Sequence, residues 1–188
     1  MWSFSTSEYL AVDDFERYDD ACRRIFFTWQ GGAPDSGSAD CGIPAFHGNG
    51  TGSTVGNSSP PFAEQTIVHL GSQSMPFGYN GLSEATRTFD VAQDWTVDGV
   101  RTLVLFFCGG AAHTPGDLYV KINGTQVPYN DSANALATRL WTRWDIDLAS
   151  VAGVDLKAVQ TLTIGVSSGL GKLYIDDIRL YRVAPTVP

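Results

Sequence analysis

Alternation of apolar and polar side chains with a period of two recurs from about residue 62 to the end of the chain, and it most constrains the fold. Leu118, Val120 and Ile122 fall on one face of a segment whose other face carries Tyr119 and Lys121. Because successive side chains of a strand point to opposite faces, this pattern predicts a strand with one buried face. The same period occurs in three further segments, 102–107, 144–148 and 162–166.

Gly, Pro, Asn and Asp separate these segments at spacings of roughly 8 to 15 residues, and no long helical repeat interrupts them. We therefore expect an all-β fold, an antiparallel β-sandwich of about eight to ten strands. The long connections favour a jelly roll over an immunoglobulin-like fold. Asn123-Gly124, between the strand that ends at Ile122 and the short run 126–129, predicts a two-residue hairpin turn.

The length of 188 residues fits one domain with its own core. We expect residues 1–10 to be an N-terminal extension, 11–182 a single jelly-roll domain and 183–188 the remnant of a linker. Inside the domain, residues 31–61 are rich in Gly, Ser, Pro, Asn and Asp, which predicts a long surface loop. The first residues lack the basic and apolar regions of a signal peptide, and we interpret the chain as a piece of a longer protein.

The charge balance limits the classes of partner. Twenty Asp and Glu against twelve Lys and Arg give a formal net charge of -8, which argues against binding to a nucleic-acid backbone. No stretch approaches the roughly 18 consecutive apolar residues of a membrane span. We therefore expect a neutral or cationic partner, and neither nucleic acid nor membrane.

Two acidic segments, one near each end of the domain, offer ligands for a hard cation. The first is an expected strand at 12–20, and the second is 173–181, where Asp176 and Asp177 interrupt an apolar run. One of these two adjacent acids should face the apolar side, which is costly unless the acid is paired or binds a metal. Calcium prefers roughly six to eight oxygen ligands from carboxylates and carbonyls. Without a metal, the first segment is a solvated edge strand protected by its charge.

Short motifs at both ends and in the middle of the chain resemble those of a known family. They are Asp14-Phe15-Glu16, residues 69–75 and residues 174–178, with further landmarks at 83–89 and 144–149. The sequence resembles the β-jelly-roll carbohydrate-binding modules with a galactose-binding-domain-like fold, over about residues 10–182. Such modules are appended to secreted bacterial enzymes and surface proteins, so the resemblance implies a secreted or cell-surface monomer tethered to a larger protein.

The resemblance also implies a structural calcium ion that joins the N-terminal and C-terminal strands without touching sugar. By position, its ligands would be the side chains of Glu16 and Asp176 and backbone carbonyls around Gly71 and Gln73, with Asp14 and Asp177 in reserve.

Aromatic residues make up 12% of the chain, and those outside the core are candidates for stacking on a sugar. Sugars present apolar C–H faces to aromatic rings, while charged and amide side chains bind their hydroxyl groups. Trp144 shares its face with Ile146, which predicts a core position, whereas Trp141 falls in phase with Arg143 and Asp145 on the opposite face. Trp141 is therefore the first candidate platform, with Arg143 and Asp145 as hydroxyl ligands.

Four further aromatic residues are candidate sugar contacts. Tyr119 and Phe106 lie opposite the apolar faces of their strands, and they would line a groove unless the long loop covers them. Phe77 and Tyr79 lie in the turn-rich segment 75–81, where aromatic side chains have less reason to be buried.

These observations predict a non-catalytic module that binds polysaccharide or oligosaccharide through surface aromatics. A jelly-roll hydrolase or lyase is the first alternative, with Glu84, Asp145 and Asp147 as candidate acids and Arg143 with Tyr119 as a candidate lyase pair. A structural or adhesive surface domain is the second. The sequence has no histidine spacing of a metalloenzyme, no nucleophile elbow, and neither a phosphate loop nor a dinucleotide motif.

Three cysteines allow one disulfide and one thiol. Cys22 and Cys41 flank the start of the long loop, and we expect a bond between them if the chain is exported. Cys108 follows an apolar run, which predicts a buried small side chain or a thiol at a strand end.

Overall fold

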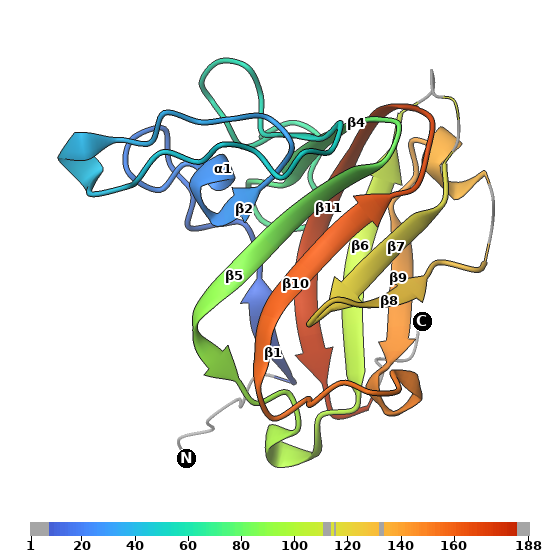
Figure 1. Ribbon diagram of the computed structural model, residues 1–188. Helices are drawn as coiled ribbons and strands as arrows, with labels where there is room; N and C mark the ends of the chain where they lie inside the picture. Colours follow the sequence, from blue (N-terminus) through green and yellow to red (C-terminus); the bar gives the residue numbers. More distant parts are fainter. Residues whose placement is uncertain (1–7, 111–113, 115, 132–133, 184–188) are drawn as a thin grey trace, which may run out of the picture.

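β-Strands make up most of the regular structure within residues 8–110, 114, 116–131 and 134–183, which are the residues that the computed structural model describes (Figure 1). The strands are β1 (Tyr9–Asp13), β2 (Trp29–Gln30), β3 (Thr54–Val55), β4 (Met75–Asn80), β5 (Ser83–Gln93), β6 (Thr102–Gly109), β7 (Leu118–Ile122), β8 (Thr125–Pro128), β9 (Thr142–Asp147), β10 (Val159–Val166) and β11 (Leu170–Tyr181). The helical elements are short: α1 (Ile25–Thr28) and the 3-10 turns η1 (Ala39–Cys41), η2 (Val97–Gly99), η3 (Ala135–Ala137) and η4 (Leu148–Ser150). Each of these described helices is too short to cross a membrane.

Two antiparallel sheets form a sandwich (Figure 1). The six-stranded sheet has the order β3-β4-β11-β6-β9, and β1 also pairs with β11. The five-stranded sheet has the order β2-β5-β10-β7-β8. β4 pairs with the first half of β11 and β1 with its second half, so the N-terminal and C-terminal strands lie side by side. The predicted all-β antiparallel sandwich is confirmed.

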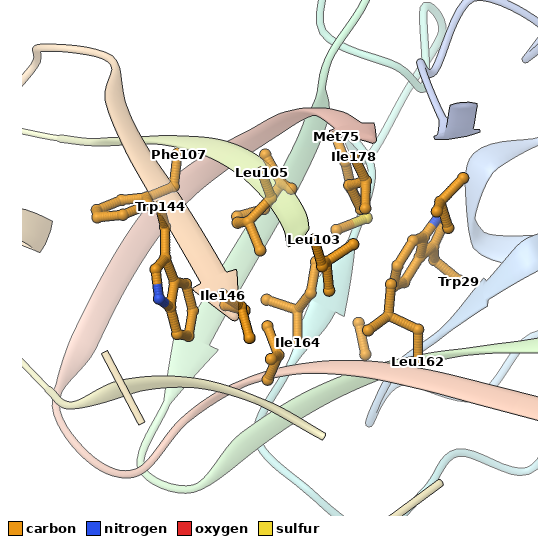
Figure 2. Close-up of a cluster of buried hydrophobic side chains, with 14 of the residues drawn as sticks. Trp29, Met75, Leu103, Leu105, Phe107, Trp144, Ile146, Leu162, Ile164 and Ile178 are labelled. Carbon is orange, nitrogen blue, oxygen red and sulfur yellow. The ribbon is translucent and has the colours of Figure 1, made fainter. Parts of the chain in front are cut away.

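The core lies between the sheets and is built from the residues that alternate with period two (Figure 2). Leu105 and Trp144 come from the six-stranded sheet, while Leu162 and Ile164 come from the five-stranded sheet. Each such side chain contributes about 1.5 to 3 kcal/mol when it leaves water. Trp144 is 7% exposed, which confirms its predicted core position.

The hairpin between β7 and β8 turns at Asn123-Gly124, as predicted. Both residues adopt positive φ angles, 47° and 84°, which this type of two-residue turn requires. The Asn123 side chain also accepts hydrogen bonds from the backbone N–H groups of Gln160 and Thr161, at 2.8 and 3.1 Å. The turn therefore also ties the hairpin to the start of β10.

A bulge in β11 changes the expected position of its two acids. Leu173 and Ile175 are buried in the core, but the next buried apolar residue is Ile178, so one extra residue breaks the period. Asp177 adopts a φ of 51° at this point. Both acids therefore remain on the outer side of the sheet, and the expectation that one of them faces the apolar side is wrong.

The predicted strand at 12–20 is shorter than expected. β1 starts at Tyr9, inside the expected N-terminal extension, and ends at Asp13. Phe15 adopts a φ of 59° and is fully buried, so the chain turns here and the acidic residues that follow lie outside the strand.

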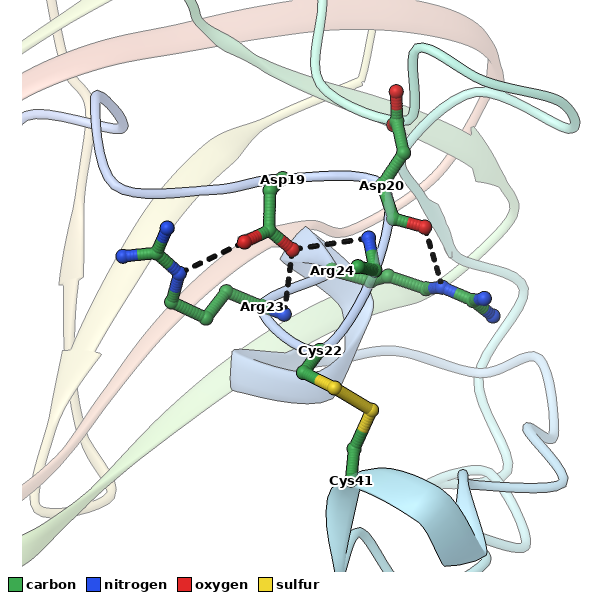
Figure 3. Close-up of a disulfide and its surroundings, with 7 residues drawn as sticks. Asp19, Asp20, Cys22, Arg23, Arg24 and Cys41 are labelled. Carbon is green, nitrogen blue, oxygen red and sulfur yellow. Dashed lines mark hydrogen bonds and ion pairs between the residues drawn. A yellow bond between two sulfur atoms is a disulfide. The ribbon is translucent and has the colours of Figure 1, made fainter.

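The long loop extends beyond the strands and is coloured from blue to cyan in Figure 1. It contains η1 and β3 and is otherwise irregular. Figure 3 shows the predicted disulfide between Cys22 and Cys41, which closes 19 residues and contributes about 3 kcal/mol in the loop-entropy model. Cys108 is a buried thiol at the end of β6, as expected.

Candidate functional site

Three strands bring five predicted site residues together on the outer face of the six-stranded sheet. Asp176 of β11, Phe106 of β6 and Arg143 of β9 are cross-strand neighbours in one row. Asp145 follows on the same face of β9, and Trp141 directly precedes this strand. Alternation along β9 thus puts Trp141 on the face opposite the buried Trp144, as expected.

The aromatic rings on this face pack on one another. His69, from the loop between β3 and β4, stacks on Phe106 with ring centroids 3.6 Å apart and an interplanar angle of 17°. Trp141 meets the same imidazole edge-on at 5.7 Å. All three residues are partly exposed. We call Phe106, His69 and Trp141 the aromatic cluster.

Beside the aromatic cluster, Arg143 and Asp145 form a two-pronged ion pair. Arg143 Nε and Nη2 donate to Asp145 Oδ1 and Oδ2 at 2.6 and 2.7 Å. A guanidinium that binds a carboxylate through two parallel hydrogen bonds is held in one orientation. The pair therefore presents ordered polar atoms next to a partly exposed tryptophan.

Phe77 and Tyr79 were expected to be surface contacts, and the structure contradicts this. They lie in β4 rather than in a turn, and they are 0% and 2% exposed. Both alternate with Gly78 and point into the sandwich with Met75. Neither ring is available for stacking on a ligand.

Tyr119 lies on the outer face of the other sheet and is also unavailable, with 3% exposed. Its ring covers Gly165, and its hydroxyl donates to Glu84 Oε1 at 2.6 Å, which Lys121 Nζ also reaches at 2.5 Å. Burial and the Glu84 carboxylate raise the pKa of Tyr119, so its hydroxyl is a poor base. Burial opposes ionisation of Glu84, but hydrogen bonds from Lys121 and Tyr119 lower its pKa.

Replacing Gly165 by alanine is expected to destabilise the fold by about 1 to 3 kcal/mol, through overpacking. A Cβ atom there would lie 2.3 Å from Cζ of Tyr119, so the ring would have to leave its place and its bond to Glu84. Urea unfolding measures the effect. In a Tyr119→Ala background the same substitution should cost much less, and an equal cost in both backgrounds would contradict this account.

Two of the predicted calcium ligands, Glu16 and Asp176, hold loop 69–73 from two sides. Glu16 Oε1 accepts the backbone N–H groups of Ser72 and Gln73 at 2.9 and 3.0 Å. Asp176 Oδ2 accepts the N–H of His69 at 2.8 Å. Loop 69–73 therefore connects the turn after β1 with β11, although its N–H groups, not its carbonyls, face the acids.

The remaining candidates have other partners. Asp177 Oδ2 binds His69 Nδ1 at 2.7 Å, and its other carboxylate oxygen binds Arg179. Asp14 Oδ1 accepts the N–H of Glu16 at 3.2 Å. We call Glu16, Asp176, Asp177 and loop 69–73 the acidic side. His69 thus belongs both to the acidic side and to the aromatic cluster.

Two features of the acidic side suit a cation. Gln73 Oε1 is buried and accepts no hydrogen bond within the part of the chain that the structure describes. Burial, with the neighbouring Asp177 carboxylate, raises the pKa of Asp176 to about 7 even though the His69 N–H opposes the shift. Among the described residues, no three His, Cys, Asp or Glu side chains are grouped as a metal site.

Known protein-family models give no match to the chain. Curated proteins also give no match. Among solved structures, the chain is similar to a family 11 carbohydrate-binding module from Clostridium thermocellum in complex with a β-1,3-1,4-mixed-linked tetrasaccharide, with a TM-score of 0.53 and 12% identity over 94% of this chain and 97% of that one.

The family 11 module of the cellulosomal cellulase Lic26A-Cel5E of Clostridium thermocellum gives a TM-score of 0.51 and 13% identity, over 98% of this chain and 100% of that one. The chain has the jelly-roll fold of carbohydrate-binding modules. At these identities the likeness concerns the fold. The predicted jelly roll is therefore confirmed.

In this jelly roll, two residues of the outer face were not predicted as ligands. His69 was expected only as part of a family motif, because nothing local in the sequence places it over Phe106. Tyr174 of β11 is partly exposed and is the cross-strand neighbour of Cys108. Tyr174 and Asp176 are two residues apart in one strand, so alternation could have assigned Tyr174 to the same face as Asp176.

Proposed function

We propose that the chain is a non-catalytic carbohydrate-binding module that binds a neutral polysaccharide or oligosaccharide at the aromatic cluster. The observation that carries this proposal is the partly exposed Trp141 ring beside the Arg143–Asp145 ion pair on one sheet face. The fold adds support, because a module of similar fold was solved with a tetrasaccharide.

The side chains of this face have the two chemistries that a sugar needs. The C–H face of a pyranose ring packs on the Trp141 ring, which His69 supports from the side. The guanidinium of Arg143 donates to sugar hydroxyl groups, and the carboxylate of Asp145 accepts from them. Because these groups are already held in place, little side-chain entropy is lost on binding.

We further propose that a calcium ion stabilises the module on its acidic side. Glu16, Asp176 and the side-chain oxygen of Gln73 are oxygen donors of the kind calcium prefers. The buried, unbonded Gln73 Oε1 supports this assignment. Bound calcium would supply the positive charge that the buried Asp176 carboxylate lacks, and the ion would hold loop 69–73 without contacting sugar.

An enzyme is less well supported by the positions of the candidate acids. Asp145 is paired with Arg143, and Asp147 Oδ1 caps the N–H of Ala149. Glu84 lies on the other sheet. The candidate lyase pair of Arg143 and Tyr119 is also divided between the two sheets, so that interpretation is wrong.

Replacing Trp141 by alanine is expected to weaken glycan binding by at least about tenfold, or roughly 1.4 kcal/mol, because the stacking platform is removed. The measurement is affinity electrophoresis and pull-down on soluble and insoluble polysaccharides, with calcium and with chelator. Thermal unfolding of the variant checks that the fold survives.

Lys121→Ala is the matched control on the outer face of the other sheet, and it should leave affinity unchanged. If Lys121→Ala weakens binding while Trp141→Ala does not, the site lies on the five-stranded sheet and the proposed location fails. Release of reducing ends in the same tubes would identify an enzyme. If no polysaccharide binds, the structural or adhesive alternative replaces the proposal.

A further inference from the structure

A pocket lies at the opposite edge of the six-stranded sheet from the aromatic cluster. It has a volume of about 410 Å³ and is lined by residues of the long loop, α1 and β3, with Lys172 of β11 at its side. β3 and β9 are the two end strands of this sheet, so the pocket and Trp141 are separated by its full width. We call it the loop pocket.

The loop that builds the pocket is folded firmly onto itself. Asp35 and Phe46 exchange two backbone hydrogen bonds of 2.8 Å, and Gly32 N–H donates to the Ser53 carbonyl at 3.1 Å. A Cβ atom on Gly32 would lie 1.8 Å from the Thr51 carbonyl oxygen, so only glycine permits this approach. Ordering so many loop residues costs backbone entropy, and ordered loops of this length usually serve a function.

Three phenyl rings from separate segments line the loop pocket. Phe26 comes from α1, Phe46 comes from the middle of the long loop, and Phe62 directly follows the loop. Phe26 and Phe62 pack edge to face with centroids 5.0 Å apart. All three side chains are only partly buried, although the core of the sandwich is close by. The rings therefore offer apolar surface to a ligand.

The polar lining carries one charge of each sign, and hydrogen bonds orient its Asp35 and Asn57 side chains. Asp35 and Lys172 contribute one carboxylate and one ammonium group, which together favour a ligand without net charge. Asp35 Oδ1 accepts the Gly37 N–H at 2.7 Å, and Asn57 Nδ2 donates to the Pro61 carbonyl at 3.0 Å. These bonds orient both side chains at the pocket wall.

A purely apolar ligand would remove water from these charged and amide groups without replacing their hydrogen bonds, which is costly. A neutral ring with apolar faces and hydroxyl edges satisfies both the phenyl rings and the polar groups. We propose that the loop pocket is a second carbohydrate site, which binds a pyranose unit of a neutral glycan. This inference rests on the proposed function, but it concerns a different site.

Nuclear magnetic resonance titration of the whole chain separates the two sites. The probes are glucose, galactose, mannose, xylose and the β-1,3-1,4-mixed-linked glucotetraose. We expect at least one of them to shift the backbone amide signals of Ala33, Asp35 and residues 54–58. Phe46→Ala should weaken the affinity measured from those shifts about tenfold, because a partly exposed ring of the pocket is lost. Leu10→Ala, on the exposed side of β1, is the control that should change nothing.

The outcomes distinguish failure of this inference from failure of the proposed function. If the sugars shift only amides near Trp141, the loop pocket is not a sugar site, while the proposed function stands. If Phe46→Ala leaves the pocket response unchanged, the inference is overturned. If only the pocket responds, and Trp141→Ala has no effect, the second site is supported and the site proposed at the aromatic cluster is wrong.

Discussion

Replacing Asp13 by alanine is expected to destabilise the fold by about 3 to 5 kcal/mol, because it removes the buried carboxylate that pairs with the partly buried Arg87 and accepts two further side-chain hydrogen bonds. Asp13 is 8% exposed, and its Oδ2 atom accepts hydrogen bonds from Trp29 Nε1 at 2.8 Å, Tyr18 Oη at 2.6 Å and Arg87 Nη1 at 2.5 Å. One carboxylate thus connects β1, the turn that follows it, β2 and β5. Denaturant unfolding, followed by tryptophan fluorescence, measures the loss.

Two controls test the cause of that loss. Asp90→Ala removes an exposed carboxylate from β5 and should change the free energy of unfolding by less than about 0.5 kcal/mol. In the double variant with Asp13→Leu and Arg87→Met, no charge stays buried without a partner, so part of the stability should return. A loss below about 1 kcal/mol for Asp13→Ala would mean that water solvates Arg87 in its place.

Local alternation predicted the sandwich and its core because strand side chains alternate between faces regardless of what the strands pair with. Trp141 and Trp144 are three residues apart, and this parity alone assigned one to the surface and the other to the core. The Asn123-Gly124 hairpin was predicted for a similar local reason, since the turn itself demands positive φ angles.

Composition gave a wrong prediction where glycine and proline lie inside a strand. Pro76 and Gly78 gave the segment around Phe77 the composition of a turn. In the structure, Gly78 instead allows β3 to approach: a Cβ atom there would lie 2.4 Å from Oγ1 of Thr54. The missing side chain serves strand packing here, and composition alone does not separate the two uses of glycine.

The candidate sites depend on contacts between distant segments, which no local pattern encodes. His69 meets Phe106 because loop 69–73 is held by Glu16 and Asp176, residues 160 positions apart in the chain. The three rings of the loop pocket likewise converge only after the long loop folds back. The family motifs identified the acidic residues, while the bulge at Asp177 decided which face they occupy.

In chelator, the free energy of unfolding is expected to fall by up to about 4 kcal/mol as the pH rises from about 4 to above 7, because of Asp176. Burial raises the pKa of this carboxyl to about 7, so the folded chain keeps a proton that the unfolded chain releases near pH 4. The contribution is therefore fully present below pH 4 and is lost as the pH passes 7. Asp176→Asn should abolish this slope, whatever its effect on absolute stability.

Calcium should act in the opposite direction, because it binds the ionised carboxylate. Its addition is expected to raise the melting temperature more at pH 8 than at pH 5, and Asp176→Asn and Glu16→Gln should both reduce that increase. His69→Gln tests whether the imidazole beside Asp177 causes the slope instead. A slope in chelator that survives Asp176→Asn but disappears in His69→Gln would assign the titration to the histidine. A calcium response that is equal at both pH values would exclude Asp176 as a ligand, since its ionisation would then not be coupled to binding.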